Sequence, residues 1–182
     1  MVKKIISLFF RCLISIAYWS YRIEGVNALL LIMPAKLIAP TLRKYGATIG
    51  EDVIIHSPLI IHNAGENYAN LLVGGKTYLG RAVFFDLKER IDIGERVTLS
   101  MRTTLITHTD AGESKVSKQM PPSSAPVRID SDAYLGANVT VLQGVHIGES
   151  SVIGAGSIVL HDVSSFAVAV GNPCKEIRKL SE

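Results

Sequence analysis

Residues 129–164 read IDSDAY-LGANVT-VLQGVH-IGESSV-IGAGSI-VLHDVS, a run of six-residue units. An aliphatic residue opens each unit, and glycine often follows it, as at Gly136, Gly148 and Gly154. The fifth residue of each unit is small or β-branched, from Ala133 to Val163. A period of six matches neither the roughly 3.6 residues of an α-helix nor the two residues of a single strand. The stretch therefore indicates a repeat architecture.

This period predicts a coil of triangular cross-section, in which each side is a short strand and each corner is a turn. The aliphatic side chain points inward, and glycine relieves crowding where the chain bends. Three units close one turn, so each inward residue should lie beneath the one three units later. The expected stacks are Ile129 with Ile147, Leu135 with Ile153, and Val141 with Val159. We therefore predict a parallel β-helix.

The repeat extends over residues 46–170, with interruptions. Ile49, Ile55 and Ile61 keep the six-residue step, and it resumes at Val73 after a polar corner at residues 62–70. The step slips by two residues near Ile91. Residues 107–126 are polar, end in several prolines and do not fit the repeat. We expect them to form a loop extruded from the coil, and a loop of this length in a compact domain is usually functional.

Residues 1–45 form a different, apolar segment. Its apolar runs are interrupted by Arg11 and end at Pro34, so none reaches the roughly 20 residues that a spanning helix needs. No clear signal-peptide cleavage site follows them. We expect helices here. They could cover the open end of the coil, whose strand edges would otherwise be unpaired, or contact a membrane surface through an apolar face.

Residues 171–182 are predicted to form a short C-terminal helix. Asn172 suits an N-cap, Pro173 suits the first helical position, and Lys and Arg enrich the last turn.

Composition restricts the function classes. A chain of 182 residues, 48% of them hydrophobic, fits one domain with an accessory segment. The net charge of +3, without a basic-aromatic patch, argues against nucleic acid as a partner. Cys12 and Cys174 lie at opposite ends, with neither metal nor disulfide spacing. We expect a cytoplasmic protein, with a peripheral position on the inner membrane face as the variant that the apolar segment allows.

Several short motifs carry a family resemblance: ITHTD at 106–110, LGANV at 135–139, GVHIG at 144–148, VIGAGS at 152–157 and VGNP at 170–173. Over residues 49–180 the chain resembles the hexapeptide-repeat acyltransferases, above all bacterial sugar O-acetyltransferases of the maltose, galactoside and capsule or exopolysaccharide type. The resemblance implies an all-β, left-handed parallel β-helix that assembles as a homotrimer. It also implies acetyl-CoA as co-substrate, no metal, and a sugar or glycan acceptor in polysaccharide biosynthesis.

Transfer of an acyl group to a hydroxyl needs a base, because a free hydroxyl barely ionises at neutral pH. Histidine suits this task, and the resemblance implies that His108, at the base of the extruded loop, is the general base. The base needs an acid to fix its tautomer and orientation. Asp86 and Asp110 are the candidates. Asp86 could instead contact the acceptor, and Asp110 could instead stabilise the loop through an Asx-turn.

The resemblance also implies a set of residues for the CoA donor, in a cleft between coils of the trimer. Small residues at two corners would let the pantetheine arm pass close to the backbone, and an aromatic residue would form a wall. The two remaining positions, His161 and Lys175, would lie towards the nucleotide end. Relatives often have lysine at the position of His161, and Lys175 could instead be part of a solvated helix face. These residues are Ala137, Ala155, Tyr134, His161 and Lys175.

Three alternatives to a sugar acetyltransferase are compatible with a coil of this kind. An antibiotic-modifying acetyltransferase would share the repeat and differ only in its acceptor pocket. A carbonic anhydrase on a similar coil would need three histidines around a metal, and the loop offers only His108. A non-catalytic assembly protein would need neither the histidine-bearing loop nor the basic C-terminus.

Overall fold

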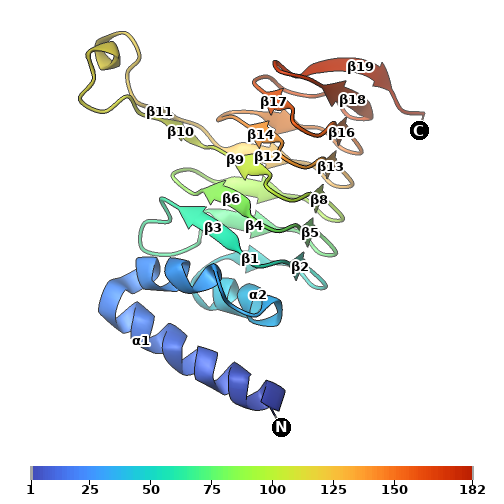
Figure 1. Ribbon diagram of the computed structural model, residues 1–182. Coiled ribbons are helices and arrows are strands. Elements are labelled where there is room, and N and C mark those ends of the chain that lie inside the picture. The colour runs from blue at the N-terminus through green and yellow to red at the C-terminus, as the bar shows by residue number, and fades with distance from the viewer. Residues whose placement is uncertain (1, 182) are drawn as a thin grey trace.

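The computed structural model describes the backbone of residues 2–181 and the side chains of residues 6 and 8–181. The chain forms a β-solenoid whose N-terminal end carries two helices, while a loop projects from its side (Figure 1). The helices are α1 (Val2–Leu30) and α2 (Ala35–Lys44), and the loop holds a 3-10 helix, η1 (Lys115–Lys118).

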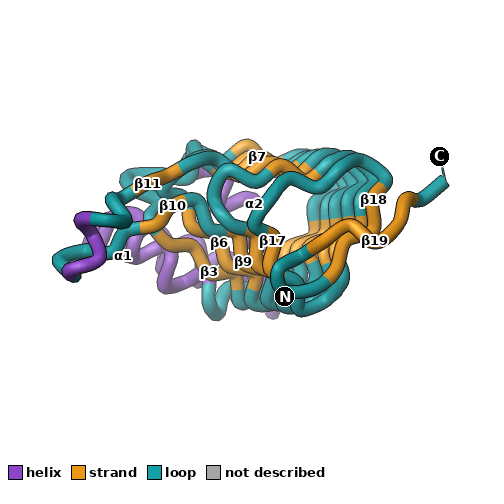
Figure 2. Tube along the Cα trace, turned by 90° about the horizontal axis from the view of Figure 1, so that it is seen from above, coloured by secondary structure: helices purple, strands orange, loops and turns teal. Residues whose placement is uncertain are grey.

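Three sheets of five, seven and five strands form the sides of the coil. The first holds β1 (Thr48–Ile49), β4 (Leu71–Val73), β7 (Ile91–Ile93), β12 (Val127–Ile129) and β15 (His146–Ile147). The second holds β2 (Ile54–Ile55), β5 (Tyr78–Leu79), β8 (Thr98–Leu99), β13 (Tyr134–Leu135), β16 (Val152–Ile153), β18 (Ala167–Val170) and β19 (Lys175–Lys179). The third holds β3 (Leu59–His62), β6 (Val83–Asp86), β9 (Thr104–Leu105), β14 (Thr140–Val141) and β17 (Ile158–Val159). Viewed from above, the turns of the coil superpose (Figure 2).

The predicted stacking is confirmed. The parallel register pairs Ile129 with Ile147, Leu135 with Ile153, and Val141 with Val159. Earlier turns are longer, because Ile55 pairs with Leu79, Leu79 with Leu99, and Leu99 with Leu135. The additional residues lie in the corner at 62–70, in the corner at 87–90 and in the loop at 107–126. The left-handed sense of the coil stays a prediction from the resemblance.

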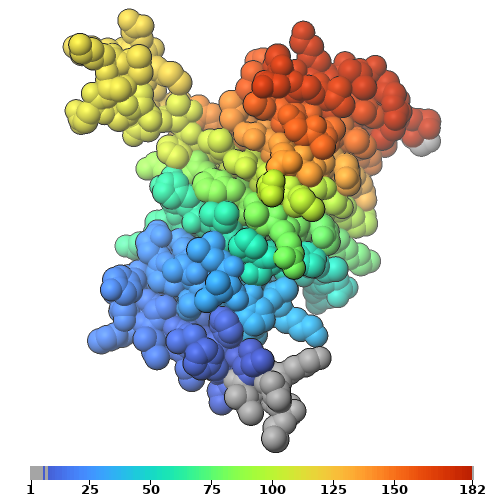
Figure 3. Space-filling view, viewed as in Figure 1, coloured from blue at the N-terminus to red at the C-terminus, as the bar shows by residue number. Residues whose placement is uncertain are grey.

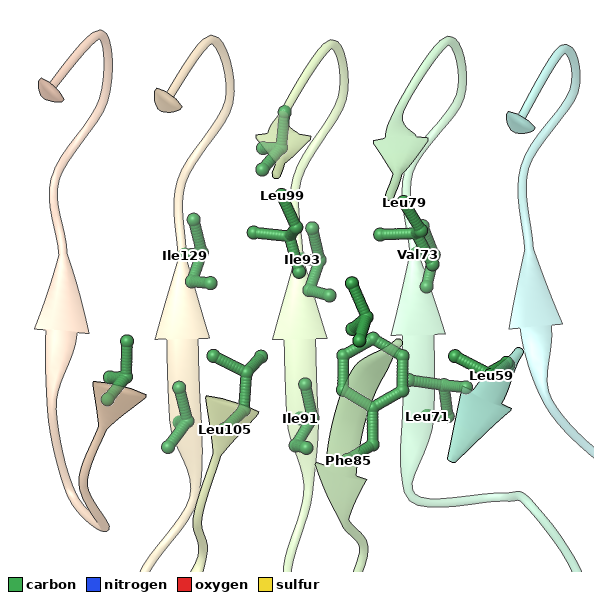
Figure 4. Packing of buried hydrophobic residues seen from close by; sticks show 14 of the residues in the cluster. Leu59, Leu71, Val73, Leu79, Phe85, Ile91, Ile93, Leu99, Leu105 and Ile129 are labelled. Carbon is green, nitrogen blue, oxygen red and sulfur yellow. The ribbon is translucent and has the colours of Figure 1, made fainter. Parts of the chain in front are cut away.

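Inward aliphatic ladders form the core of the coil. Figure 4 shows Ile129, Ile93 and Val73 in one row across successive turns, with Leu99 and Leu79 in the row above it. All five side chains are buried, and burying an aliphatic side chain of this size contributes about 1.5–3 kcal/mol. The ladders therefore supply much of the stability of this coil.

Glycine is required where successive turns approach closely. A Cβ atom at Gly136 would lie 2.6 Å from the backbone nitrogen of Ala155, on the next turn. Any side chain at this position would push the turns apart. This contact explains why the repeat places glycine directly after its aliphatic residue.

The N-terminal helices cover the open end of the coil. The part of α1 after a kink at Tyr21 and Arg22 contacts β3, and α2 contacts β1 and β2. Buried side chains from both helices join the core cluster of the coil, and the hydroxyl of buried Tyr68 donates to Asn27 Oδ1 at 2.7 Å. The expected helices and their capping role are both present. Among the described residues, no helix is long and apolar enough to cross a membrane.

The predicted C-terminal helix at residues 171–182 is wrong. Residues Lys175–Lys179 form β19, which pairs antiparallel with β18. The other edge of β18 pairs with β16, so without β19 its second edge would present unpaired N–H and C=O groups. Pairing along this edge outweighs the local helix signals of Asn172 and Pro173.

Candidate active site

His108 lies where the extruded loop leaves the coil. It is the first residue of β10 (His108–Thr109), which pairs antiparallel with β11 (Ser123–Ser124). This two-stranded stem carries the loop tip away from the body of the molecule (Figures 1 and 3). The predicted extrusion of residues 107–126 is therefore present, and it holds His108 at the foot of the stem.

Asp86 lies beside His108 because it ends β6, the strand that pairs with β9 just before the loop. Its buried carboxylate contacts the His108 ring, with 2.5 Å between Oδ2 and Nδ1. The same oxygen accepts hydrogen bonds from the backbone N–H groups of Thr107 and His108 at 2.9 and 3.1 Å, and the Thr107 hydroxyl donates to the Asp86 backbone carbonyl at 2.7 Å. Asp86 thus fixes both the start of the loop and the imidazole ring.

The Asp86 carboxylate is kept ionised by these contacts. Burial alone would raise its pKa, but hydrogen bonds from His108, Asn63 and the Thr107 N–H outweigh this effect and hold the pKa below the ordinary value of 3.8. At neutral pH the group is therefore a hydrogen-bond acceptor only.

The hydrogen-bond network assigns the tautomer of His108. Since Asp86 can only accept, the Nδ1 atom of a neutral His108 ring carries the proton between them. The Nε2 atom then holds the lone pair, and it has no hydrogen-bond partner within the part of the chain that the structure describes. Such a nitrogen can take a proton from a bound hydroxyl.

A polar pocket of about 360 Å³ lies next to His108. Hydroxyl, amide and charged groups dominate its walls, which come from the loop stem and from the corner of an earlier turn. The lining residues are Asn63, Lys88, His108, Thr109, Asp110, Pro122, Ser123 and Ser124.

Asn63 also belongs to this site, although the sequence pattern did not predict it. Its Nδ2 atom donates to Asp86 Oδ1 at 2.8 Å, so it supports the carboxylate from the side opposite His108. The strand register places His62 next to Asp86, and Asn63 follows directly. A count of 24 residues from Ile61 to its partner Phe85 would have revealed this position.

Asp110 lines the same pocket, but among the described residues it forms no hydrogen bond or ion pair with His108. Its Oδ1 atom accepts a hydrogen bond from the Gly112 N–H at 2.7 Å, the Asx-turn that the sequence left as one alternative. Asp86, not Asp110, is the acid that touches the histidine.

The residues expected to bind CoA do not line this pocket and lie on turns nearer to the C-terminus. Ala137 and Ala155 occupy one corner on successive turns, where the Ala137 carbonyl accepts from the Gly156 N–H at 2.8 Å. Tyr134 lies nearby on β13 with its side chain exposed. The corner brings Ala137 close to the residue after Ala155, and the role of all three residues stays a prediction.

His161 and Lys175 are separate again. His161 lines a second, open pocket with Gln143, Gly144 and Asp162. Gln143 also donates to the Ser123 hydroxyl at 2.7 Å, so the second pocket adjoins the loop stem. Lys175 is exposed on β19 and pairs with Val170. Its predicted helix is absent, and its predicted contact to CoA phosphates stays a prediction.

The remaining histidines lie outside the pocket next to His108. His146 contacts Asp130 on the previous turn, with 2.7 Å between Nε2 and Oδ2, while the rings of His56 and His62 lie tilted beside those of Tyr78 and Phe84. Within the described residues, no three His, Cys, Asp or Glu side chains are grouped closely enough to hold a metal ion.

Comparisons with known proteins agree with the repeat. A family profile described as the hexapeptide repeat of succinyl-transferase matches residues 126–161. A galactoside O-acetyltransferase of Lactococcus lactis subsp. lactis (strain IL1403) is 34% identical over 148 residues, which is 78% of this chain and 67% of that protein. Against several Staphylococcus aureus relatives, in contrast, the chain spans only 29% to 31% of their length.

Solved structures share the fold. A maltose O-acetyltransferase from Clostridium difficile 630 superposes with a TM-score of 0.75 at 25% identity, covering 87% of this chain and 84% of that one. A galactoside acetyltransferase in complex with coenzyme A gives a TM-score of 0.71 at 25% identity, covering 87% and 78% of the two chains. The coil, the extruded loop and the match to the Lactococcus relative lead to one conclusion: the chain belongs to the hexapeptide-repeat acetyltransferase family.

Proposed function

We propose that this protein transfers an acetyl group from acetyl-CoA to a hydroxyl group of a sugar or glycan precursor, as a step in polysaccharide biosynthesis. The observation that carries the proposal is the His108 ring, which contacts buried Asp86 through Nδ1 and lines a polar pocket. This arrangement has the parts of a general base: a held tautomer, a free lone pair and space for a substrate.

The proposed reaction is direct transfer in a ternary complex. His108 Nε2 takes the proton from the acceptor hydroxyl while the oxygen attacks the carbonyl carbon of the thioester. Backbone N–H groups in the cleft stabilise the tetrahedral oxyanion. The intermediate then breaks its carbon–sulfur bond, and the protonated His108 returns the proton to the departing thiolate. The Asp86 carboxylate stabilises the imidazolium between these two steps.

The pocket composition supports a sugar as the acceptor. Its walls offer the Asn63 amide, the Lys88 ammonium and the hydroxyls of Thr109, Ser123 and Ser124. These groups can donate and accept hydrogen bonds at several points, which a polyhydroxylated ring requires. The names of the maltose and galactoside O-acetyltransferases among the similar proteins point in the same direction.

The donor and the assembly are part of the same proposal. The similar galactoside acetyltransferase was solved in complex with coenzyme A. In this chain the positions expected to contact CoA, such as Tyr134, Ala155 and Lys175, lie on exposed surfaces. A second coil beside them would convert this open surface into a cleft, so we propose a homotrimer. Its mass in solution, measured by light scattering, should be three times 19.7 kDa, and a mass of one chain would contradict the assembly.

The test of the function is acetyl-CoA turnover in the presence of sugar acceptors. CoA thiol release should depend on a sugar from a panel of maltose, galactosides and N-acetylated hexoses, with the acetylated sugar identified by mass spectrometry. Treatment with a chelator should leave the rate unchanged, since the proposal needs no metal. A folded protein that fails to bind acetyl-CoA in calorimetry would overturn the proposal and favour an assembly role for the coil.

A further inference from the structure

An apolar surface remains uncovered on the first part of α1. The side chains of Leu8, Phe9, Ile16 and Trp19 are exposed, with exposed fractions of 60% at Ile16 and 83% at Trp19. Their spacing of one, seven and three residues places them along one stripe of a helix. On the other side, Ile14 is buried and lines a pocket with residues of α2. One face of this helix packs on the protein, and the opposite apolar face does not.

The charge distribution singles out the same segment. Residues 1–45 contain seven Lys or Arg and a single acid, Glu24, which gives a net charge of +6. The whole chain carries +3, so the remaining residues carry −3. No acid precedes Glu24, whereas Lys3, Lys4 and Arg11 do. The cationic part of the molecule is therefore the part with the exposed apolar stripe.

The position of α1 makes this surface accessible. Figure 1 shows the first part of α1 beneath α2, at the opposite end of the molecule from β18 and β19. The kink at Tyr21 and Arg22 separates it from the part that contacts the coil. A flat surface could therefore approach the stripe without meeting the projecting loop stem or the coil.

We infer that the first part of α1 lies in the interface of an anionic lipid bilayer, parallel to its surface. An interfacial helix combines aromatic and aliphatic residues on one face with Lys and Arg around it, and acidic headgroups attract such basic segments. This inference goes beyond the proposed transfer reaction and does not depend on it. It assigns the N-terminal segment a second role besides capping the coil.

A second copy of the chain is the less suitable occupant. If two copies covered this face with their own α1 helices, two segments of net charge +6 would meet, and like charges would oppose the contact. An anionic bilayer complements both the apolar stripe and its charge.

Trp19 provides a direct probe, because it is the only tryptophan of the chain. We expect its fluorescence emission to shift to shorter wavelength when the full-length protein meets phosphatidylglycerol vesicles, and the protein to sediment with them. Phosphatidylcholine vesicles should give a much weaker effect, and high salt should weaken binding to the anionic vesicles. If Trp19 emission and sedimentation stay unchanged with phosphatidylglycerol, the inference is wrong.

Paired variants locate the contact. Leu8→Gln with Ile16→Gln keeps Trp19 and good helix propensity, and we expect it to lower the vesicle partition coefficient by about tenfold or more. The matched control is Ile54→Gln on β2, where the isoleucine is 54% exposed. This residue lies outside both the stripe and the positively charged segment 1–45. An equal loss in the control would overturn the assignment to α1. So would a Trp19 shift that follows protein concentration without lipid, since a second copy would then cover the stripe.

Discussion

Two histidine–aspartate pairs lie on this coil, and they differ in ways that matter for chemistry. His108 contacts Asp86 through Nδ1 at 2.5 Å, while His146 contacts Asp130 through Nε2 at 2.7 Å. The Asp86 side chain is 2% exposed, against 22% for Asp130. Asp130 also accepts a hydrogen bond from the Arg128 guanidinium at 2.8 Å, whereas no lysine or arginine pairs with Asp86 among the described residues.

The difference teaches that an acidic neighbour alone does not make a histidine a base. Asp130 shares its charge between a histidine and an arginine near solvent, where ion pairs contribute little. Asp86 is buried and contacts a single ring. Its carboxylate also accepts hydrogen bonds from the backbone N–H groups of Thr107 and His108, and these bonds fix the start of the loop beside that ring. Among the described residues, the partner geometry also leaves different ring nitrogens without a hydrogen bond, Nε2 in His108 and Nδ1 in His146.

The largest expected effect comes from removing each ring in turn. His108→Ala should lower kcat for acetyl transfer by about a thousandfold, within the usual range for loss of a general base. His146→Ala should change kcat by less than about threefold, because His146 lies outside the pocket. Steady-state CoA release measures both. Similar losses in the two variants would abolish the distinction between the pairs.

The next effect concerns the two acids. Asp86→Asn keeps the shape but replaces an acceptor by a group that can donate, so His108 should lose its tautomer preference and kcat should fall about a hundredfold. The KM for acetyl-CoA should stay nearly constant, because Asp86 is not expected to contact the donor. Asp130→Asn is the control and should leave kcat nearly unchanged. A KM effect without a kcat effect would assign Asp86 to acceptor or donor binding instead.

A smaller effect is expected at Asn63, which supports Asp86 from the other side. Asn63→Ala removes one hydrogen bond to the charged carboxylate, so kcat should fall by about three- to tenfold and the pKa of Asp86 should rise. Asn70→Ala is a matched control in the same corner, since Asn70 donates to the Leu87 carbonyl instead. Equal kinetic effects of the two substitutions would mean that Asn63 only stabilises the corner and does not act on catalysis through Asp86.

The smallest expected difference between the two pairs is in how the free energy of unfolding depends on pH under acidic conditions. Burial favours the neutral form of Asp86, but its hydrogen bonds lower the folded pKa below the ordinary 3.8. The unfolded chain therefore binds the proton first as pH falls. The contribution of Asp86 is complete above the unfolded pKa and is lost as pH falls through the folded pKa.

Asp130 follows the same sign, with burial opposed by His146 and Arg128, but solvent screens it more. Urea midpoints measured from neutral to acid pH should therefore depend on pH less steeply in Asp86→Asn than in the wild type. Asp130→Asn should reduce this slope by a smaller amount. The reverse order would contradict the burial argument.

The coil could be predicted because its signal is repeated. Ile129, Ile147 and their equivalents occupy one environment turn after turn, so a single physical requirement appears many times in the sequence. The same arithmetic located the extruded loop and the slip near Ile91, since a corner can absorb additional residues without disturbing the ladders. The approximate place of His108 followed from the loop.

Features that occur once were harder to predict. The segment 171–182 has local signals for a helix, yet Lys175–Lys179 pair as a strand with the free edge of β18. This tertiary pairing produces no repeated pattern in the sequence. Asn63 lies in an irregular corner, so only the register of β3 with β6 reveals it. The choice between Asp86 and Asp110 likewise needed side-chain geometry.

The central claim is that the two pairs hold opposite histidine tautomers, and long-range ¹H–¹⁵N correlation spectra of the histidine rings at neutral pH test it directly. We expect the proton on Nδ1 in His108 and on Nε2 in His146, with assignments from His108→Ala and His146→Ala. A His108 ring protonated on Nε2 would have no lone pair facing the pocket, and it would contradict the proposed role of His108 as the base.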